Sequence, residues 1–190
     1  MSYTDWIPVL EILQDKKQLS ILEFGIGAGT KALVDNFEKV FSLEILNDRE
    51  WFDKTVEQLK DYKNYNAKYI DAPELFKRHE EFTKSAKPIP SGNNFQSERP
   101  AKLLLEILES SKGSINYGEY DGFFVDAGVY LRGEIVNFVL QFKPKFVLVH
   151  DTNGFDDYGY NLVDTDEYAY FGFQTGDGTG LFWRKEKCVN

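Results

Sequence analysis

Glycine recurs at every second position directly after a short apolar run near the start of the chain. The run Ser20–Phe24 has the length of a strand, and Gly25, Gly27 and Gly29 follow it before a helical pattern begins at Thr30. A strand, a glycine-rich turn and a helix bring bare backbone and free N–H groups close to a ligand. This stretch predicts a nucleotide-type binding loop; glycines that merely make turns are the alternative.

Two acidic residues accompany this loop. Glu23 lies two residues before the first glycine, and Glu44 follows twenty-one residues later within the apolar run Val40–Ile45. A carboxylate at the end of a second strand can accept both hydroxyls of a ribose. A dinucleotide fingerprint would need glycine where Thr30 stands, and Glu23 would suit a positive amino group better than a pyrophosphate. These residues therefore favour a nucleoside ligand with an amino group.

Polar residues also follow two apolar runs in the second half. Asp126 ends the run that begins at Gly122, and His150, Asp151 and Asn153 end or follow the run that begins at Phe146. Asp126, Asp151 and Asn153 offer oxygen donors of the kind that Mg²⁺ prefers. His150 is a candidate general base because the ordinary pKa of histidine is close to neutral. Capping of the next helix or turn by the aspartates, and orientation of the loop by His150, stay open as structural alternatives.

Short apolar runs alternate with amphipathic segments along the chain. This predicts an α/β fold: a Rossmann-like doubly wound sheet, mostly parallel, with an antiparallel C-terminal hairpin and helices on both faces. The expected strands are Ser20–Phe24, Val40–Ile45, Ala67–Asp71, Gly122–Asp126, Phe146–His150, Tyr168–Gln174 and Leu181–Lys185. The expected helices are Trp6–Asp15, Thr30–Phe37, one that Asn47 or Asp48 caps, Pro73–Ala86, Ala101–Ser111 and Arg132–Phe142.

Residues 1–190 are expected to form a single domain with an insertion at about 76–113. Asp71 and Asp126 are 55 residues apart, which is more than one helix and its turns require. Lys87–Pro100 holds three prolines and has no apolar periodicity, so it is expected to be a loop. The insertion is either a lid over the bound substrate or a disordered surface segment.

Composition narrows the function classes. The chain has 31 acidic and 22 basic side chains, a net charge of −9, which speaks against nucleic-acid binding and against docking on an anionic membrane. No run approaches the roughly 18 apolar residues of a spanning helix. The single cysteine excludes an internal disulfide, and the first residues show no signal peptide. A cytoplasmic protein is the expectation.

The segment Glu23–Gly29 resembles the first motif of class I S-adenosylmethionine (SAM) dependent methyltransferases. Glu44 is similar to the family's ribose-binding acid, and the C-terminal hairpin to its antiparallel seventh strand. Tyr69-Ile70-Asp71-Ala72 resembles the third-strand motif, which implies that Asp71 approaches the adenine amino group and that Ala72 supplies a backbone contact. The resemblance covers nearly all of the chain except 76–113.

The second half resembles small-molecule O-methyltransferases of the catechol and sugar types. There an aspartate after the fourth strand and an Asp-Asn pair after the fifth bind a metal that holds and activates the acceptor hydroxyl. This implies Asp126, Asp151 and Asn153 as metal ligands. The chain departs from the pattern in two ways: Thr152 separates Asp151 from Asn153, and no lysine follows Asp126.

The expected function is transfer of a methyl group from SAM to a small-molecule acceptor, to oxygen and with Mg²⁺ as a candidate cofactor. Cofactor binding is assigned to Glu23, Gly25, Gly27, Gly29, Glu44, Asp71 and Ala72, and catalysis to His150 and Asp126. A non-catalytic SAM-binding or partner-binding module is the alternative, and an NAD- or nucleotide-sugar-dependent enzyme is a weaker one. No nucleic acid and no membrane is expected as a partner, and a homodimer stays open.

Overall fold

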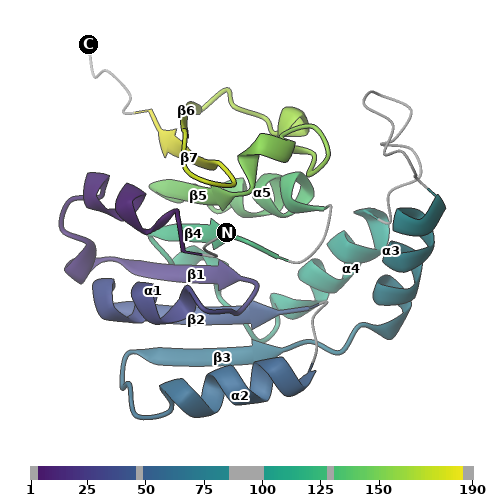
Figure 1. Cartoon of the computed structure of the whole chain (residues 1–190), viewed down its shortest axis with the longest axis horizontal. Helices are drawn as coiled ribbons and strands as arrows, with labels where there is room; N and C mark the ends of the chain where they lie inside the picture. Colours follow the sequence, from purple (N-terminus) through teal and green to yellow (C-terminus); the bar gives the residue numbers. More distant parts are fainter. Residues whose placement is uncertain (1–3, 46–48, 86–100, 128–130, 186–190) are drawn as a thin grey trace.

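The structure is a computed structural model that describes residues 4–45, 49–85, 101–127 and 131–185. Seven strands form one sheet in the order β3-β2-β1-β4-β5-β7-β6 (Figure 1). They are β1 (Ser20–Phe24), β2 (Lys39–Glu44), β3 (Tyr65–Tyr69), β4 (Gly122–Val125), β5 (Phe146–His150), β6 (Tyr168–Phe173) and β7 (Thr179–Arg184). β1 to β5 pair in parallel, and β7 runs antiparallel to both β5 and β6. The predicted doubly wound sheet with a C-terminal hairpin is confirmed.

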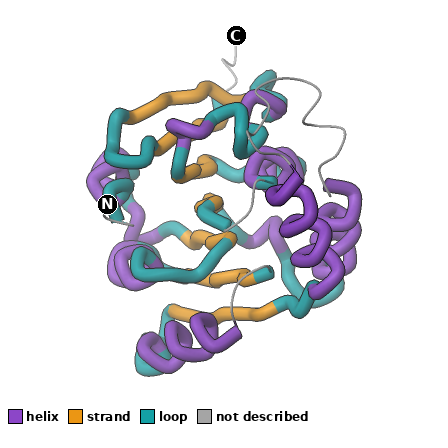
Figure 2. The backbone as a smooth tube through the Cα atoms, turned by 45° about the vertical axis from the view of Figure 1, so that its right-hand side comes forward, coloured by secondary structure: helices purple, strands orange, loops and turns teal. Residues whose placement is uncertain are grey.

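Helices cover the sheet on both faces, as Figure 2 shows. They are α1 (Thr30–Asn36), α2 (Arg49–Leu59), α3 (Pro73–Ser85), α4 (Ala101–Ser111) and α5 (Arg132–Leu140). One apolar core joins α3, α4 and α5 to the sheet, and the other joins α1, α2 and the N-terminal segment to the opposite face. Strand β4 supplies both cores, since Phe123 and Val125 point to the first and Phe124 to the second. In the described part of the chain, no helix is long and apolar enough to cross a membrane.

The N-terminal segment differs from its prediction. A helix over Trp6–Asp15 was expected, but the structure has a 3₁₀-helix, η1, over Ile7–Ile12 and a second short one, η2, over Lys16–Gln18. Trp6, Val9 and Leu13 are buried, and their spacing of three and four residues satisfies a 3₁₀-helix as well as an α-helix. Asp15 lies between the two short helices in the left-handed conformation, at φ 52°, so no α-helix can continue through it.

The predicted insertion contains regular structure at both ends. Helix α4 lies within it, and Leu104 and Leu108 are fully buried in the core that α5 shares. This helix, which lies between β3 and β4 along the chain, therefore packs on the sheet and is not an added surface segment. The predicted loop Lys87–Pro100 lies outside the described residues, so the lid stays a prediction.

Gly25, directly after β1, has a backbone conformation that the loop requires. Its φ is +93°, and a Cβ at this position would lie 2.5 Å from the carbonyl oxygen of Asp126. The turn therefore needs glycine for two independent reasons, an unusual φ and a close approach to the end of β4. The close approach of the Gly25 and Asp126 backbones brings the glycine loop and Asp126 together at the carboxyl edge of the sheet.

We expect Gly25→Ala to lower the free energy of unfolding by about 1–3 kcal/mol, because the strained φ and the backbone contact act together. The control is Gly113→Ala, where the nearest atom to a new Cβ is 3.7 Å away. That variant should keep the wild-type stability or gain up to about 1 kcal/mol. Urea unfolding followed by circular dichroism measures both, and equal stability of the two variants would contradict the close approach at Gly25.

Candidate functional site

A cavity of about 540 Å³ lies at the carboxyl edge of the sheet. This is the edge at which open parallel sheets bind ligands, and the volume lies within the roughly 300–1,000 Å³ of small-molecule sites. Its lining residues are Glu23, Gly25, Ile26, Gly27, Ala28, Gly29, Trp51, Phe124, Asp126, Arg132, His150, Asp151 and Asp177. A larger hollow beside Trp183 lies at the opposite edge, where β5 begins, among Lys143, Lys145 and other charged side chains. The structure thus brings the glycine loop together with Asp126, His150 and Asp151.

Glu23 holds the glycine loop in place through the hydroxyl of Thr30. The Thr30 hydroxyl lies 3.0–3.1 Å from both carboxyl oxygens of Glu23, and the N–H of Gly27 donates to this same hydroxyl at 2.9 Å. Ser42 also donates to Glu23, at 2.6 Å. Burial is the main cause that raises the pKa of Glu23, to about 8, against the opposing effect of these hydrogen bonds. At neutral pH this carboxyl is therefore mostly protonated, although it lines the cavity.

The peptide of Ile26 is held by two further side chains. Its N–H donates to Glu44 at 3.0 Å, and its carbonyl accepts a hydrogen bond from the indole of Trp51 at 2.9 Å. Glu44 is 1% exposed and does not line the cavity in this arrangement. Its ribose-binding role stays a prediction, and the observed role of its carboxylate is to brace the loop.

The third-strand residues lie apart from the cavity. Strand β3 ends at Tyr69, Asp71 is exposed, and Ala72 is buried in the core shared with α3, α4 and α5. Neither Asp71 nor Ala72 lines the cavity. Their assignment to the adenine rests on the sequence resemblance and stays a prediction.

Arg132, the first residue of α5, forms the centre of an ionic network. Its Nη1 lies 3.1 Å from a carboxylate oxygen of Asp126 and 2.9 Å from one of Asp151. Nη1 also donates to the backbone carbonyl of His150, and Nε donates to that of Ala127 at 2.7 Å. The residue is 4% exposed. A buried guanidinium thus joins the ends of β4 and β5.

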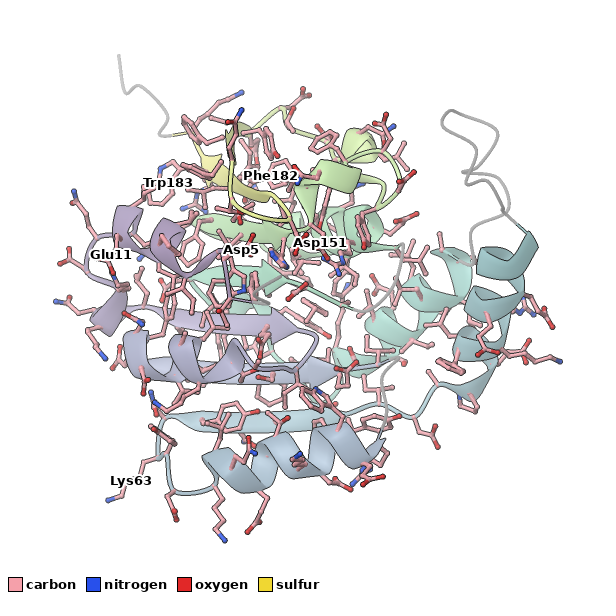
Figure 3. All side chains as sticks on the ribbon, viewed as in Figure 1. Asp5, Glu11, Lys63, Asp151, Phe182 and Trp183 are labelled. Atoms are coloured by element: carbon pink, nitrogen blue, oxygen red, sulfur yellow. The ribbon has the colours of Figure 1, made fainter. Side chains whose placement is uncertain are left out.

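His150 lies between two carboxylates. Its Nδ1 is 3.2 Å from Asp126, and its Nε2 is 2.6 Å from Asp5 of the N-terminal segment. Figure 3 shows Asp5 and Asp151 close together beside the ends of β4 and β5. Burial acts to lower the pKa of His150, but the hydrogen bonds and charges of Asp126, Asp151 and Asp5 outweigh it and raise the pKa to about 9. With both ring nitrogens engaged and the ring charged, this geometry does not favour the predicted general-base role.

The predicted magnesium ligands do not fit that ion in this arrangement. Ligand atoms of Asp126, His150 and Asp151 lie within 4.8 Å of one another. The guanidinium of Arg132 contacts both carboxylates and so takes up the position that a cation would need. The amide of Asn153 instead donates to the carbonyl of Gly176 at 3.1 Å, at the turn before β7. The magnesium site is therefore not supported by the geometry.

Sequence reasoning did not assign three residues of the site: Arg132, Asp5 and Trp51. Trp51 is 40% exposed, and its indole donates to the backbone of the glycine loop. Arg132 carried one usable signal, an arginine at the start of a helix that follows an aspartate by six residues. Asp5 carried none, because 145 residues separate it from His150.

The fold occurs in solved structures of methyltransferases. A methyltransferase of Podospora anserina, PaMTH1, bound to S-adenosylhomocysteine (SAH), has a TM-score of 0.57 at 14% identity and covers 95% of this chain and 76% of its own. A candidate caffeoyl-CoA O-methyltransferase from Staphylococcus aureus has a TM-score of 0.54 at 11% identity, over 97% of this chain and 85% of its own.

The 23S rRNA methyltransferase ErmE has a TM-score of 0.54 at 14% identity, over 97% of this chain and 69% of its own. The chain has the class I methyltransferase fold. Neither protein-family models nor curated proteins match its sequence. At these identities the structural likeness establishes the fold alone. The residues that line the cavity therefore carry the inference of function.

We expect the stability of the protein to depend on the protonation of Glu23. The folded state keeps the proton of Glu23 up to about pH 8, whereas the unfolded state loses it near the ordinary glutamate pKa of 4.5, so the contribution of Glu23 to stability is fully present below pH 4.5. As pH rises toward 8, the free energy of unfolding falls by about 1 kcal/mol per pH unit from this group, and then levels off.

Glu23→Gln should remove this part of the slope, because the amide imitates the neutral acid. Urea unfolding between pH 5 and pH 8 measures the slope for wild type and variant. Glu38→Gln, at an exposed position, is the matched control and should keep the wild-type slope. If Glu23→Gln also keeps it, Glu23 is ionised in the folded protein.

Proposed function

We propose that this chain is a SAM-dependent methyltransferase that acts on oxygen of a small-molecule acceptor. The observation that carries the proposal is a single cavity that is lined both by the glycine loop and by Asp126, His150 and Asp151. The sheet order and the antiparallel β7 support the methyltransferase part of it. The acceptor and the atom that is methylated are inferred from the chemistry of the cavity.

The glycine loop supports SAM as the cofactor. Gly27 has open space beside its Cα, so a ligand can contact the backbone there without meeting a side chain. Glu23 lines the same part of the cavity and is held in place by Thr30 and Ser42. A protonated Glu23 can donate a hydrogen bond, and an approaching ammonium group would favour its ionised form. The amino group of SAM is such a group.

The proposed reaction is a direct displacement. The acceptor oxygen attacks the methyl carbon of SAM, the carbon–sulfur bond breaks, and SAH leaves with the electron pair on sulfur. The hydroxyl proton passes to a base, and the carboxylates of Asp126 and Asp151 are the groups placed to accept it, with 27% and 26% of their side chains exposed. His150 holds Asp126 in place through Nδ1. Alignment of nucleophile and methyl group supplies most of the acceleration in such a reaction.

The charges of the cavity favour a small hydroxyl compound over RNA. Carboxyl groups of Glu23, Asp126, Asp151 and Asp177 line it, and they can accept hydrogen bonds from hydroxyls. The chain has a net charge of −9, so a phosphate backbone would meet repulsion from the protein as a whole. ErmE acts on rRNA with a similar fold, so an RNA acceptor is the outcome to be tested against.

We expect calorimetric titration to detect binding of SAM and of SAH to the wild-type protein in the presence of chelator. Gly27→Val should fold normally, since no atom lies within 4 Å of a Cβ there, but its side chain would occupy the cavity. We expect the affinity for SAM to fall about tenfold or more. Gly113→Ala is the control, and unchanged binding to Gly27→Val would place the cofactor elsewhere.

Acceptor identity is tested by SAH formation with panels of catechols, sugars and structured RNA. Turnover with a hydroxyl compound supports the proposal, and turnover with RNA alone overturns its acceptor part. SAM binding without turnover on any panel would favour a non-catalytic SAM-binding module. Absence of SAM binding would overturn the proposed function.

A further inference from the structure

We propose that Arg132 is a built-in cation that takes the place of a divalent metal ion between Asp126 and Asp151 and keeps such ions out of the site. For its bearing on methyl transfer the inference rests on the proposed function, but metal exclusion itself is a property of the protein without any ligand. The residue acts as a positioning residue, since it orients two carboxylates that face the cavity.

The geometry of Arg132 carries the inference. One nitrogen, Nη1, lies within 3.1 Å of both carboxylates, and the two aspartates come from the ends of neighbouring parallel strands. A metal ion that bridged these carboxylates would need the same space between them. Divalent ions bind carboxylate oxygens at about 2.0–2.6 Å, so the ion and the guanidinium cannot both contact the pair.

Backbone and aromatic contacts hold the guanidinium in addition to its contacts with the two aspartates. Nε donates to Ala127, and Nη1 donates to the carbonyl of His150, which also accepts the hydroxyl of Tyr160 at 2.7 Å. The ring of Tyr158 lies 4.3 Å from the guanidinium carbon, a cation–π distance. A side chain held by this many contacts cannot swing away cheaply to admit a metal ion.

Charge compensation points the same way. The guanidinium of Arg132 lies beside both Asp126 and Asp151, so the acid pair already has a counter-ion. A divalent ion would have to enter a site with a fixed cation in contact with both of its carboxylate ligands. Arginine keeps its charge at all accessible pH values, which makes this neutralisation permanent.

The test is Mn²⁺ binding, followed by the electron paramagnetic resonance signal of free Mn²⁺, with the full-length protein. Wild type and Asp151→Asn should bind Mn²⁺ alike, through scattered surface acids only. Arg132→Met should gain one site whose affinity for Mn²⁺ is about tenfold or more above that of the surface acids of wild type, because the positive charge beside the two carboxylates is removed. Arg132→Lys should restore exclusion, and Arg132→Met/Asp151→Asn should lose the gained site.

Thermal unfolding gives a second readout. Mn²⁺ should raise the melting temperature of Arg132→Met, whose acid pair has lost its counter-ion, and leave that of wild type unchanged relative to chelator. One Mn²⁺ bound to wild type and lost in Asp151→Asn would overturn the inference, and so would a folded Arg132→Met that gains no site. Should Arg132→Met fail to fold, the comparison of wild type with Asp151→Asn still decides. None of these measurements uses SAM, so a failure of the proposed function would be seen separately.

Discussion

The ionic contact between Arg132 and the two aspartates is the interaction on which the rest of the site depends. It joins the ends of β4 and β5, and it lies where the apolar core of the sheet gives way to the cavity. Removal of one partner from a buried pair of this kind typically costs about 3–5 kcal/mol, because the remaining charge is left uncompensated. The network therefore sets both the positions of Asp126 and Asp151 and the charge of the cavity wall.

The network extends from the sheet into the first residues of the chain. Asp5 accepts a hydrogen bond from the N–H of Asp177 at 2.7 Å as well as contacting His150, so it links the N-terminal segment to the turn before β7. Trp6 anchors this segment below the glycine loop, with its ring 4.4 Å from that of Phe124. A Cβ at Gly29 would lie 2.5 Å from the Trp6 ring, so the segment and the loop are fitted to each other.

The glycine loop is shaped by side chains from several elements rather than by its glycines alone. Thr30 of α1, Glu44 of β2 and Trp51 of α2 each bind backbone atoms of the loop. Such bracing holds the cavity open before any ligand arrives, which lowers the ordering cost of binding. Use of the Glu44 carboxylate inside the protein also means that a ribose would have to compete with the N–H of Ile26 for it.

The sequence by itself determined the order and type of most elements. β1, β5 and α4 match their expected bounds, because apolar periodicity and glycine or proline boundaries are local signals. The grouping of Asp126, His150 and Asp151 followed from the rule that parallel strands end at one edge. Only the tertiary structure decided what these groups do. Arg132 contacts Asp151 across 19 residues of sequence, and Asp5 contacts His150 across 145. The choice between a metal ion and a guanidinium depends on side-chain positions that no local pattern encodes.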